Sequence, residues 1–179
     1  MAESLFERRF SCRSFEPTAL SDAEIEPLIE AARWAPSAGN LQPWRFVVVR
    51  SATLREELAR SAHGQEFVAV APVVIVVCAV PAESARRYRE RGEQLYCLQD
   101  TAAAVENILL AATEHGLGSC WVGAFDEDAA ARCLSVPFGW RPVAMIPVGW
   151  PLGTVPPRQR RPREETVVWA GSTGHRVET

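Results

Sequence analysis

The chain contains no lysine, so all 19 of its basic residues are arginine. This absence excludes every mechanism in which the protein supplies a lysine, including the pyridoxal-phosphate Schiff base and the phosphate contact of a Walker motif. A bound anion must therefore be held by arginine side chains, by backbone amides or by the N-terminal ends of helices.

Long apolar runs, cysteine motifs and metal-ligand spacings are also absent. The longest apolar run, 68–80, is broken by Pro72 and is too short to cross a membrane. The five cysteines form no CxxC pair and the three histidines show no ligand spacing, which favours reduced thiols and no metal site. Residues 1–10 lack the apolar stretch of a signal peptide. We therefore expect a soluble, cytoplasmic protein with no membrane partner.

Familiar catalytic and nucleotide-binding motifs are missing as well. The sequence has no GxGxxG, GxSxG, P-loop or HExxH pattern, and no pair of carboxylates suggests glycosidase chemistry. The net charge of -3 argues against a nucleic-acid partner, because phosphate backbones bind basic surfaces. No side chain is assigned a catalytic role from the sequence.

The hydrophobic pattern predicts one domain in which helices and strands alternate. Apolar residues make up 47% of the 179 residues, which is enough for a core. Ser21 and Glu24 match a capping box at the start of a helix, and Pro27 conflicts with the interior of that helix. The β-branched run 73–80 predicts a central strand covered on both faces. The predicted helices are 4–10, 21–34, 53–61, 83–91, 94–115 and 126–133, and the predicted strands are 46–49, 73–80, 119–122 and 143–148. This alternation predicts a layered α/β or α+β domain.

Two segments with alternating arginines are candidates for anion binding. Arg9, Ser11 and Arg13 would point the same way in an extended loop and form a phosphate cradle. The alternative is a solvated basic loop. Arg158 and Arg160 alternate in a proline-stiffened tail, for which the alternative is an ordinary charged tail.

We do not predict anion binding for a third arginine-rich segment or for the end of the tail. The arginines within 86–91 lie among glutamates, and we interpret them as a solvated helix face with some ion pairs. The β-prone patch 166–169 has little to pack against in its own domain. Pairing with the sheet edge of a second chain would bury it.

Two loops have the composition of ligand-binding turns. Residues 35–44 carry a serine, an asparagine and a glutamine between prolines, and such donors and acceptors suit the edge of a flat heterocycle. The alternative is a turn whose polar side chains satisfy its own backbone. In residues 116–125, Gly123 and Ala124 would let a ligand approach backbone N–H groups closely.

Four segments, taken in chain order, resemble the nitroreductase family of FMN enzymes over nearly the whole chain. They are the N-terminal arginine segment, residues 35–44, residues 116–125 and the arginine-proline tail. The strongest part is 35–44, APSAGNLQPW, which precedes a β-rich strand. The resemblance implies an α+β fold with a mixed central β-sheet flanked by helices. It also implies a homodimer in which the C-terminal tail strand is exchanged to the partner subunit. Residues 1–155 would form the FMN-binding domain, and 156–179 a C-terminal arm that adds phosphate-binding arginines and packs on the partner.

The resemblance also implies which residues bind the flavin. Arg9 and Ser11 would bind the phosphate and ribityl chain, and Arg13 would lie near the pyrimidine edge. Arg158 and Arg160 would close on the phosphate from the C-terminal side.

The remaining implied contacts are with the flavin ring. The residues reaching the ring from the other subunit would be Pro36, Ser37, Ala38 and Asn40. The residues running along the ring would be Trp121, Val122, Gly123 and Ala124, with the N–H of Ala124 or Gly123 facing N5. Gln65 is implied at the flavin edge.

The implied function is transfer of hydride from NADH or NADPH through flavin N5 to a small acceptor, in ping-pong order. A nitroaromatic or quinone-like acceptor suits an open, flat site. The alternatives are an oxygen-using dehydrogenase or flavin-consuming enzyme of the same fold, and a non-catalytic flavin-binding dimer. The chain departs from the family pattern at Phe10, where a second basic residue is usual, and it lacks the longer insertions that often form a substrate lid.

Overall fold

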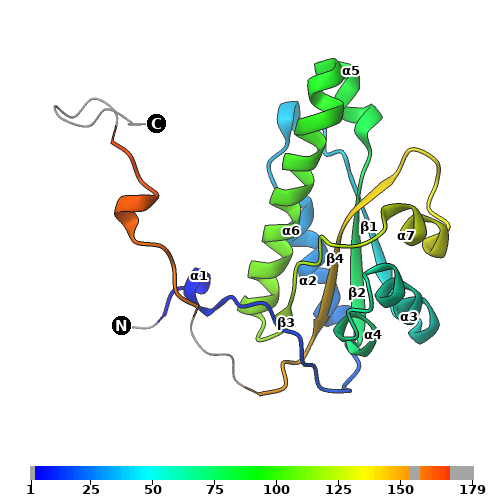
Figure 1. Cartoon of the computed structure of the whole chain (residues 1–179), viewed down its shortest axis with the longest axis vertical. Helices are drawn as coiled ribbons and strands as arrows, with labels where there is room; N and C mark the ends of the chain where they lie inside the picture. The colour runs from blue at the N-terminus through cyan, green and yellow to red at the C-terminus, as the bar shows by residue number, and fades with distance from the viewer. Residues whose placement is uncertain (1–2, 154–157, 170–179) are drawn as a thin grey trace.

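The strand β2 (Val73–Ala79) lies at the centre of the fold, and all seven of its residues are buried. It pairs on one side with β1 (Trp44–Val49) and on the other with β4 (Arg141–Gly149), beyond which lies β3 (Gly118–Ser119). These pairings are all antiparallel. The structure is a computed structural model that describes residues 3–153 and 158–169 (Figure 1).

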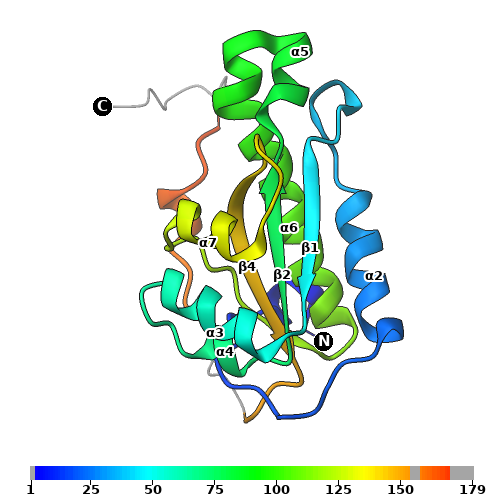
Figure 2. The same ribbon diagram turned by 90° about the vertical axis from the view of Figure 1, so that its right-hand side faces the viewer.

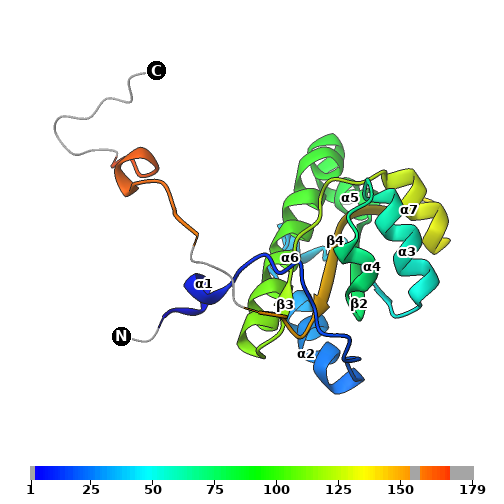
Figure 3. The same ribbon diagram turned by 60° about the horizontal axis from the view of Figure 1, so that its bottom comes forward.

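The helices α2 (Asp22–Arg33) and α6 (Cys97–Glu114) cover one face of the sheet (Figure 3). Leu28 and Ile108 from these helices are completely buried and belong to the same core cluster as Ile75 of β2. Apolar residues three and four positions apart on each helix form this buried face, as the sequence pattern predicts.

The opposite face is covered by α3 (Ala52–Ser61), α4 (Phe67–Val70) and α7 (Glu127–Leu134). Val76 of β2 points into this second cluster together with Leu58 of α3. Because successive strand residues point to opposite faces, β2 is buried on both sides. The prediction of a central, doubly covered strand is therefore confirmed, and so is the α+β class.

Most predicted elements are present with small shifts at their ends. The capping box at Ser21 is formed, and α2 continues through Pro27 to its end. Gly116 ends α6 with a left-handed φ of 74°. The predicted strand 119–122 is shorter: β3 is followed by a single bridge from Val122 to Met145. The four-residue α4 was not predicted, because one helical turn leaves no periodic pattern.

The sheet of the described chain is antiparallel, not mixed as predicted. The four strands are antiparallel throughout, and the one parallel pairing found within residues 3–153 and 158–169 is a bridge between Ser11 and Ser119. It ties the segment after the short helix α1 (Leu5–Arg8) to the sheet. Within the same ranges, no helix is both long enough and apolar enough to span a membrane.

The sheet has two ends that carry different loops. At one end β1 begins at Trp44, opposite Ala79, directly after the loop that contains η1 (Ala38–Asn40). At the other end Ser119 pairs with Val148, which also lies opposite the first residue of β2. At about 3.3 Å per residue, the length of β2 separates these two ends by about 20 Å.

The apex of the molecule, residues 81–96, is formed by α5 (Pro81–Arg91) and the π-helical turn η2 (Gly92–Tyr96) (Figure 1). The chain reverses at Arg89, which has φ 51° and ψ -138°. Gly92 then lies against the backbone of Ser84, where an ideal Cβ would come within 2.6 Å of the carbonyl carbon. Only glycine allows so close an approach.

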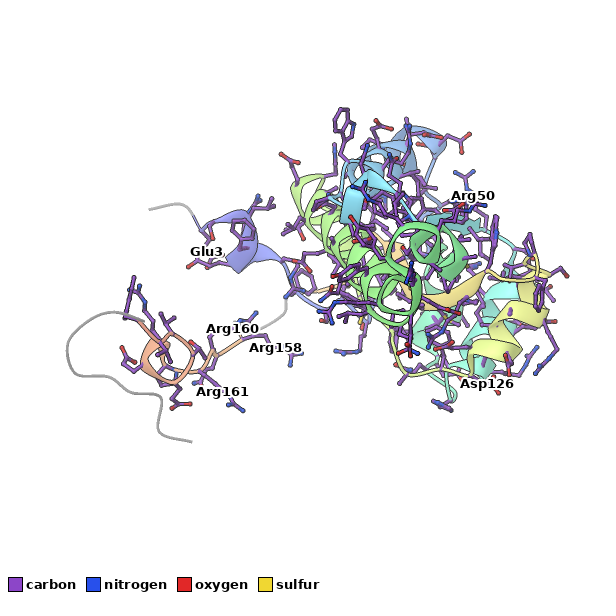
Figure 4. The ribbon with its side chains drawn as sticks, turned by 90° about the horizontal axis from the view of Figure 1, so that it is seen from above. Glu3, Arg50, Asp126, Arg158, Arg160 and Arg161 are labelled. Carbon is purple, nitrogen blue, oxygen red and sulfur yellow. The ribbon has the colours of Figure 1, made fainter. Side chains whose placement is uncertain are left out.

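The C-terminal arm, residues 158–169, extends away from the body (Figures 1 and 4). All twelve of these residues are exposed, and they contain one short helix, η3 (Arg163–Glu165). Residues 166–169 form no strand within the single chain, so strand exchange stays a prediction. The predicted boundary between 155 and 156 lies outside the described residues.

We predict that Gly92→Ala lowers the free energy of unfolding by about 1–3 kcal/mol, the cost of forcing a methyl group into a filled space. Gly123→Ala is the matched control, because its new Cβ would meet nothing nearer than Trp121 Nε1 at 3.9 Å. Urea unfolding of both variants tests this. Equal stability of the two would mean that the apex does not have this close packing.

Candidate functional site

The N-terminal segment is fixed against β3 by backbone contacts. The N–H of Cys12 donates to the carbonyl of Ser119 over 2.9 Å, beside the parallel bridge from Ser11. A Cβ on Gly118 would come within 2.6 Å of Cys12 Sγ, so this approach requires glycine. These contacts hold the alternating residues around Cys12 in an extended conformation, as the spacing predicts.

The side chains of Arg9, Ser11 and Arg13 converge around one buried thiol. Burial raises the pKa of Cys120, and the guanidiniums of Arg13 and Arg9 together with a hydrogen bond to Ser11 lower it in part. The Arg13 guanidinium also lies over the ring of Phe67, 5.6 Å from its centre. Arg9 also forms an ion pair with Glu106 of α6 over 3.9 Å, and Arg13 is exposed, so the segment is fixed against the body while part of its charge is paired or solvated.

Gln65 and Ala124 border this region from two other segments. Gln65 Nε2 donates to the carbonyl of Ala124 over 3.1 Å, which joins the turn before α4 to the segment after β3. We call Arg9, Ser11, Arg13, Gln65 and Ala124 the N-terminal cluster. It brings together residues from three of the predicted flavin-contacting segments.

The segment 121–124 presents backbone to solvent in its second half. The N–H and C=O of Val122 both pair with Met145, at 2.9 and 3.0 Å, and its side chain is buried. Val122 therefore has no free backbone group for a ligand. Trp121, Gly123 and Ala124 are exposed, and within the described residues the N–H groups of Gly123 and Ala124 donate no hydrogen bond. Those two groups are available to a ligand atom.

One buried polar atom beside the N-terminal cluster has no protein partner. Ser119 is 2% exposed, and its Oγ makes no hydrogen bond to any described residue. A buried hydroxyl without a partner is costly, so it marks a place where a ligand or water completes the structure. Arginines, hydroxyls and free backbone N–H groups form a donor set that suits a phosphate and a heterocycle edge.

Polar side chains of the loop 36–43 form hydrogen bonds within the loop itself, as the alternative interpretation of these residues proposed. The Ser37 hydroxyl accepts from the Gln42 N–H at 3.0 Å, and the Gln42 amide donates to Asn40 Oδ1 at 3.2 Å. Gly39, Asn40 and Gln42 all have positive φ, between 51° and 59°. Pro36 and Asn40 remain exposed. Three left-handed residues in four give a shape that few sequences adopt.

Asp100 of α6 holds this loop, and sequence reasoning missed it. Its Oδ1 accepts from the N–H of Ala38 at 3.0 Å, while its other oxygen is buried without a described partner. Burial raises the pKa of Asp100, and the hydrogen bond from Ala38 lowers it in part. An acidic residue inside an otherwise apolar helix stripe was the signal that could have identified it.

The predicted site residues thus fall into three groups within one chain. The N-terminal cluster lies at one end of the sheet and the loop 36–43 at the other, beneath the apex (Figure 2). Arg158 and Arg160 lie on the arm, away from the body (Figure 4). A ligand held by one chain could not touch all three groups.

Comparison with known proteins identifies the class of this protein. Residues 6–69 and 61–150 match the model of the nitroreductase family. The chain therefore belongs to the nitroreductase family. As a member of that family, it is an NAD(P)H-dependent oxidoreductase.

Individual relatives cover most of the chain. A protein from Archaeoglobus fulgidus, provisionally named an NADH dehydrogenase/NAD(P)H nitroreductase, is 35% identical over 147 residues, which are 80% of this chain and 81% of that protein. A 5,6-dimethylbenzimidazole synthase from Rhodospirillum rubrum is 26% identical over 197 residues, or 98% and 92%. The crystal structure of a nitroreductase family protein from Streptococcus pneumoniae matches with a TM-score of 0.84 and 28% identity, covering 92% of this chain and 98% of that one.

We predict that Asp100→Asn and Asp100→Ala differ in stability. The Asn variant keeps an oxygen for the Ala38 N–H, whereas the Ala variant leaves that donor unpaired and loses about 1–3 kcal/mol of unfolding free energy relative to Asn. Because the pKa of Asp100 is raised in the folded chain, its ionised form is a cost at neutral pH that disappears as the pH falls. The advantage of Asn over the wild type should therefore shrink from neutral pH to about pH 4. Urea unfolding across that range checks both points, and parallel pH curves would contradict the second.

Proposed function

We propose that two copies of this chain share two FMN sites, each built from the N-terminal cluster of one copy and the loop 36–43 of the other. The observation that carries the proposal is the distance between these groups, which lie at opposite ends of one sheet. A twofold dimer that places one end of the sheet in one copy against the opposite end in its partner would bring the N-terminal cluster and the loop 36–43 together. The resemblance of both segments to flavin-binding motifs supports the same arrangement.

Each group has a role that its chemistry supports. Arg9 and Ser11 bind the phosphate and ribityl chain, where a guanidinium forms charge-assisted hydrogen bonds. Arg13, oriented over Phe67, places positive charge at the pyrimidine edge. The free N–H groups of Gly123 and Ala124 face the ring, and Gln65 lies at its edge. Pro36, Ser37, Ala38 and Asn40 reach the ring from the partner, and Asp100 keeps them in position.

When bound, FMN supplies the hydride chemistry that passes electrons from NADH or NADPH to a second substrate in turn. The protein binds the ring, excludes water from part of it and leaves one face open. The exposed Trp121 and Gly123 border that open side. A flat, electron-poor acceptor such as a nitroaromatic or a quinone suits such a site. The five free cysteines are consistent with a cytoplasmic location.

A second candidate is a flavin-consuming or oxygen-using enzyme of the same fold. The observation that favours it is the likeness to the Rhodospirillum rubrum 5,6-dimethylbenzimidazole synthase over nearly the whole chain. NAD(P)H oxidation that proceeds anaerobically with a nitroaromatic or quinone acceptor supports the reductase. Loss of the flavin itself in the presence of oxygen supports the second candidate.

The arm completes the site in this proposal. Residues 166–169 add a strand to the free outer edge of β1 in the partner, which within the described residues pairs only with β2. Arg158 and Arg160 then close on the flavin phosphate. Residues 158–169 are all exposed in the single chain, and Trp169 is 65% exposed. This exposure is consistent with a partner that covers the arm.

We predict that two defective variants restore one site between them. Arg9→Gln/Arg13→Gln damages the N-terminal cluster, and Asn40→Gly removes a loop side chain while tolerating its positive φ. Each variant alone should lose FMN. Heterodimers purified through two different tags should bind about half the wild-type amount, because such a dimer holds one intact site. Visible absorbance after gel filtration measures the flavin. A heterodimer as poor as its parents would refute the shared site.

We also predict that Arg160→Ala weakens FMN binding by about 10- to 100-fold, the loss of one charged contact worth roughly 1.5–3 kcal/mol. Arg161→Ala is the matched control, because it removes the same charge from the opposite side of an extended segment. Fluorescence titration of the apoprotein with FMN compares them. Equal FMN affinities of the two variants would show that the alternating arginines of the arm do not bind the phosphate.

A further inference from the structure

The apex carries four exposed arginines whose charges are not neutralised by neighbouring carboxylates. Arg86, Arg87, Arg89 and Arg91 are all exposed, and none forms an ion pair with another described residue. The segment also contains three glutamates, and within the described residues none of them forms an ion pair with these arginines. Glu83 pairs with Arg45 at 2.5 Å, and Glu90 accepts from the Gln94 amide at 2.9 Å. The segment is thus the solvated helix face that the sequence indicated, and its ion pair is made by Glu83 rather than by its arginines.

Two of these guanidiniums are held over aromatic rings. Arg87 lies 5.5 Å from the centre of the Tyr88 ring, and Arg91 lies 5.3 Å from that of Tyr96. Arg91 Nε also donates to the Tyr96 hydroxyl at 2.9 Å. The two tyrosines meet edge to face at 5.1 Å, so the arginines share one rigid platform. A guanidinium that is already oriented loses less entropy when it binds an anion.

The backbone beneath these side chains is strained in a way that a plain solvated helix does not need. Arg89 has φ 51° and ψ -138°, a backbone conformation that residues with a Cβ rarely adopt. A π-helical turn follows directly, and such turns occur often at functional sites. Local strain persists where the surrounding structure maintains it, and it concentrates at binding sites.

The apex also touches the loop that the proposed function sends to the flavin of the partner. A Cβ on Gly39 would lie 2.8 Å from Arg87 Nη1 and 2.8 Å from the Tyr88 hydroxyl. Arg87 is therefore adjacent to the loop that faces the flavin ring in the proposed function. In a protein of net charge -3, the apex has a formal charge of +1, and one of its glutamates is already paired with Arg45 of β1.

We propose that the apex arginines bind the phosphates of the nicotinamide dinucleotide whose nicotinamide ring reaches the shared flavin site. This inference rests on the proposed function. A donor that places its nicotinamide on the flavin must leave its diphosphate outside the ring site, and guanidinium groups bind phosphate oxygens in pairs. The diphosphate is common to NADH and NADPH, whereas the 2′-phosphate belongs to NADPH alone. The apex thus holds the donor while the N-terminal cluster holds the flavin.

The test compares three hydride donors on the FMN-loaded protein. Arg86→Gln/Arg89→Gln removes two exposed apex charges that form no hydrogen bond, ion pair or ring contact within the described residues. Arg60→Gln/Arg132→Gln removes two charges from α3 and α7 on another face. The donors are NADH, NADPH and 1-benzyl-1,4-dihydronicotinamide, which carries no phosphate. We expect the KM for both dinucleotides to rise about tenfold in the apex variant, as expected for one lost charged contact. The KM for the benzyl compound, the FMN affinity and all values of the control variant should not change.

The outcomes separate this inference from the proposed function. A rise for NADPH alone supports the apex as a site for the 2′-phosphate. Unchanged dinucleotide KM values in a variant that still holds FMN overturn the inference and leave the shared flavin site intact. An equal rise for the benzyl compound also overturns it, because the effect would not depend on phosphate. A wild-type protein that takes up no FMN refutes the proposed function itself.

Discussion

The separation that the sheet imposes between its two ends is the constraint on which the rest of the molecule depends. β2 is buried on both faces and paired on both edges, so the loops at its ends cannot approach each other without unfolding the core. The N-terminal cluster and the loop 36–43 therefore stay at different ends of the sheet in one chain. In the proposed function, this separation is the reason that a second copy is part of the flavin site. Stability of the single domain and assembly of the site are thus separate requirements on the sequence.

The lack of lysine is consistent with how this protein positions its positive charges. Arg13, Arg45, Arg87 and Arg91 each lie over an aromatic ring, at 5.3 to 5.6 Å from its centre. A planar guanidinium stacks on a ring and still presents N–H donors at its edge, whereas an ammonium group is more strongly hydrated and less directional. An arginine held in this way is oriented before its ligand arrives. Aromatic rings therefore orient Arg13, Arg87 and Arg91, while Arg45 is held both by a ring and by its ion pair with Glu83.

Much of the fold could be predicted from the sequence, because the patterns that indicate these elements involve residues only a few positions apart. The capping box at Ser21, the glycine at 116 and the unbroken apolar run of β2 each predicted the element that the structure contains. Features that depend on contacts between residues far apart in the sequence could not be predicted. Asp100 gains its role only when α6 passes beside Ala38, 62 positions earlier. The reversal at Arg89 likewise depends on Gly92 meeting the backbone of Ser84.

The same distinction applies to the candidate site. The alternating arginines and the loop 35–44 were identifiable by their residue types, but their placement at opposite ends of the sheet was not. That placement has a chemical consequence. A flavin phosphate and a dinucleotide diphosphate are both anions, and two anions that share one cationic pocket repel each other. Holding the first with the N-terminal cluster of one copy and the second with the apex of the other keeps the charges apart while their rings meet. In the proposed dimer, division of the site between two copies would therefore place two negatively charged molecules at one redox centre while keeping their charges apart.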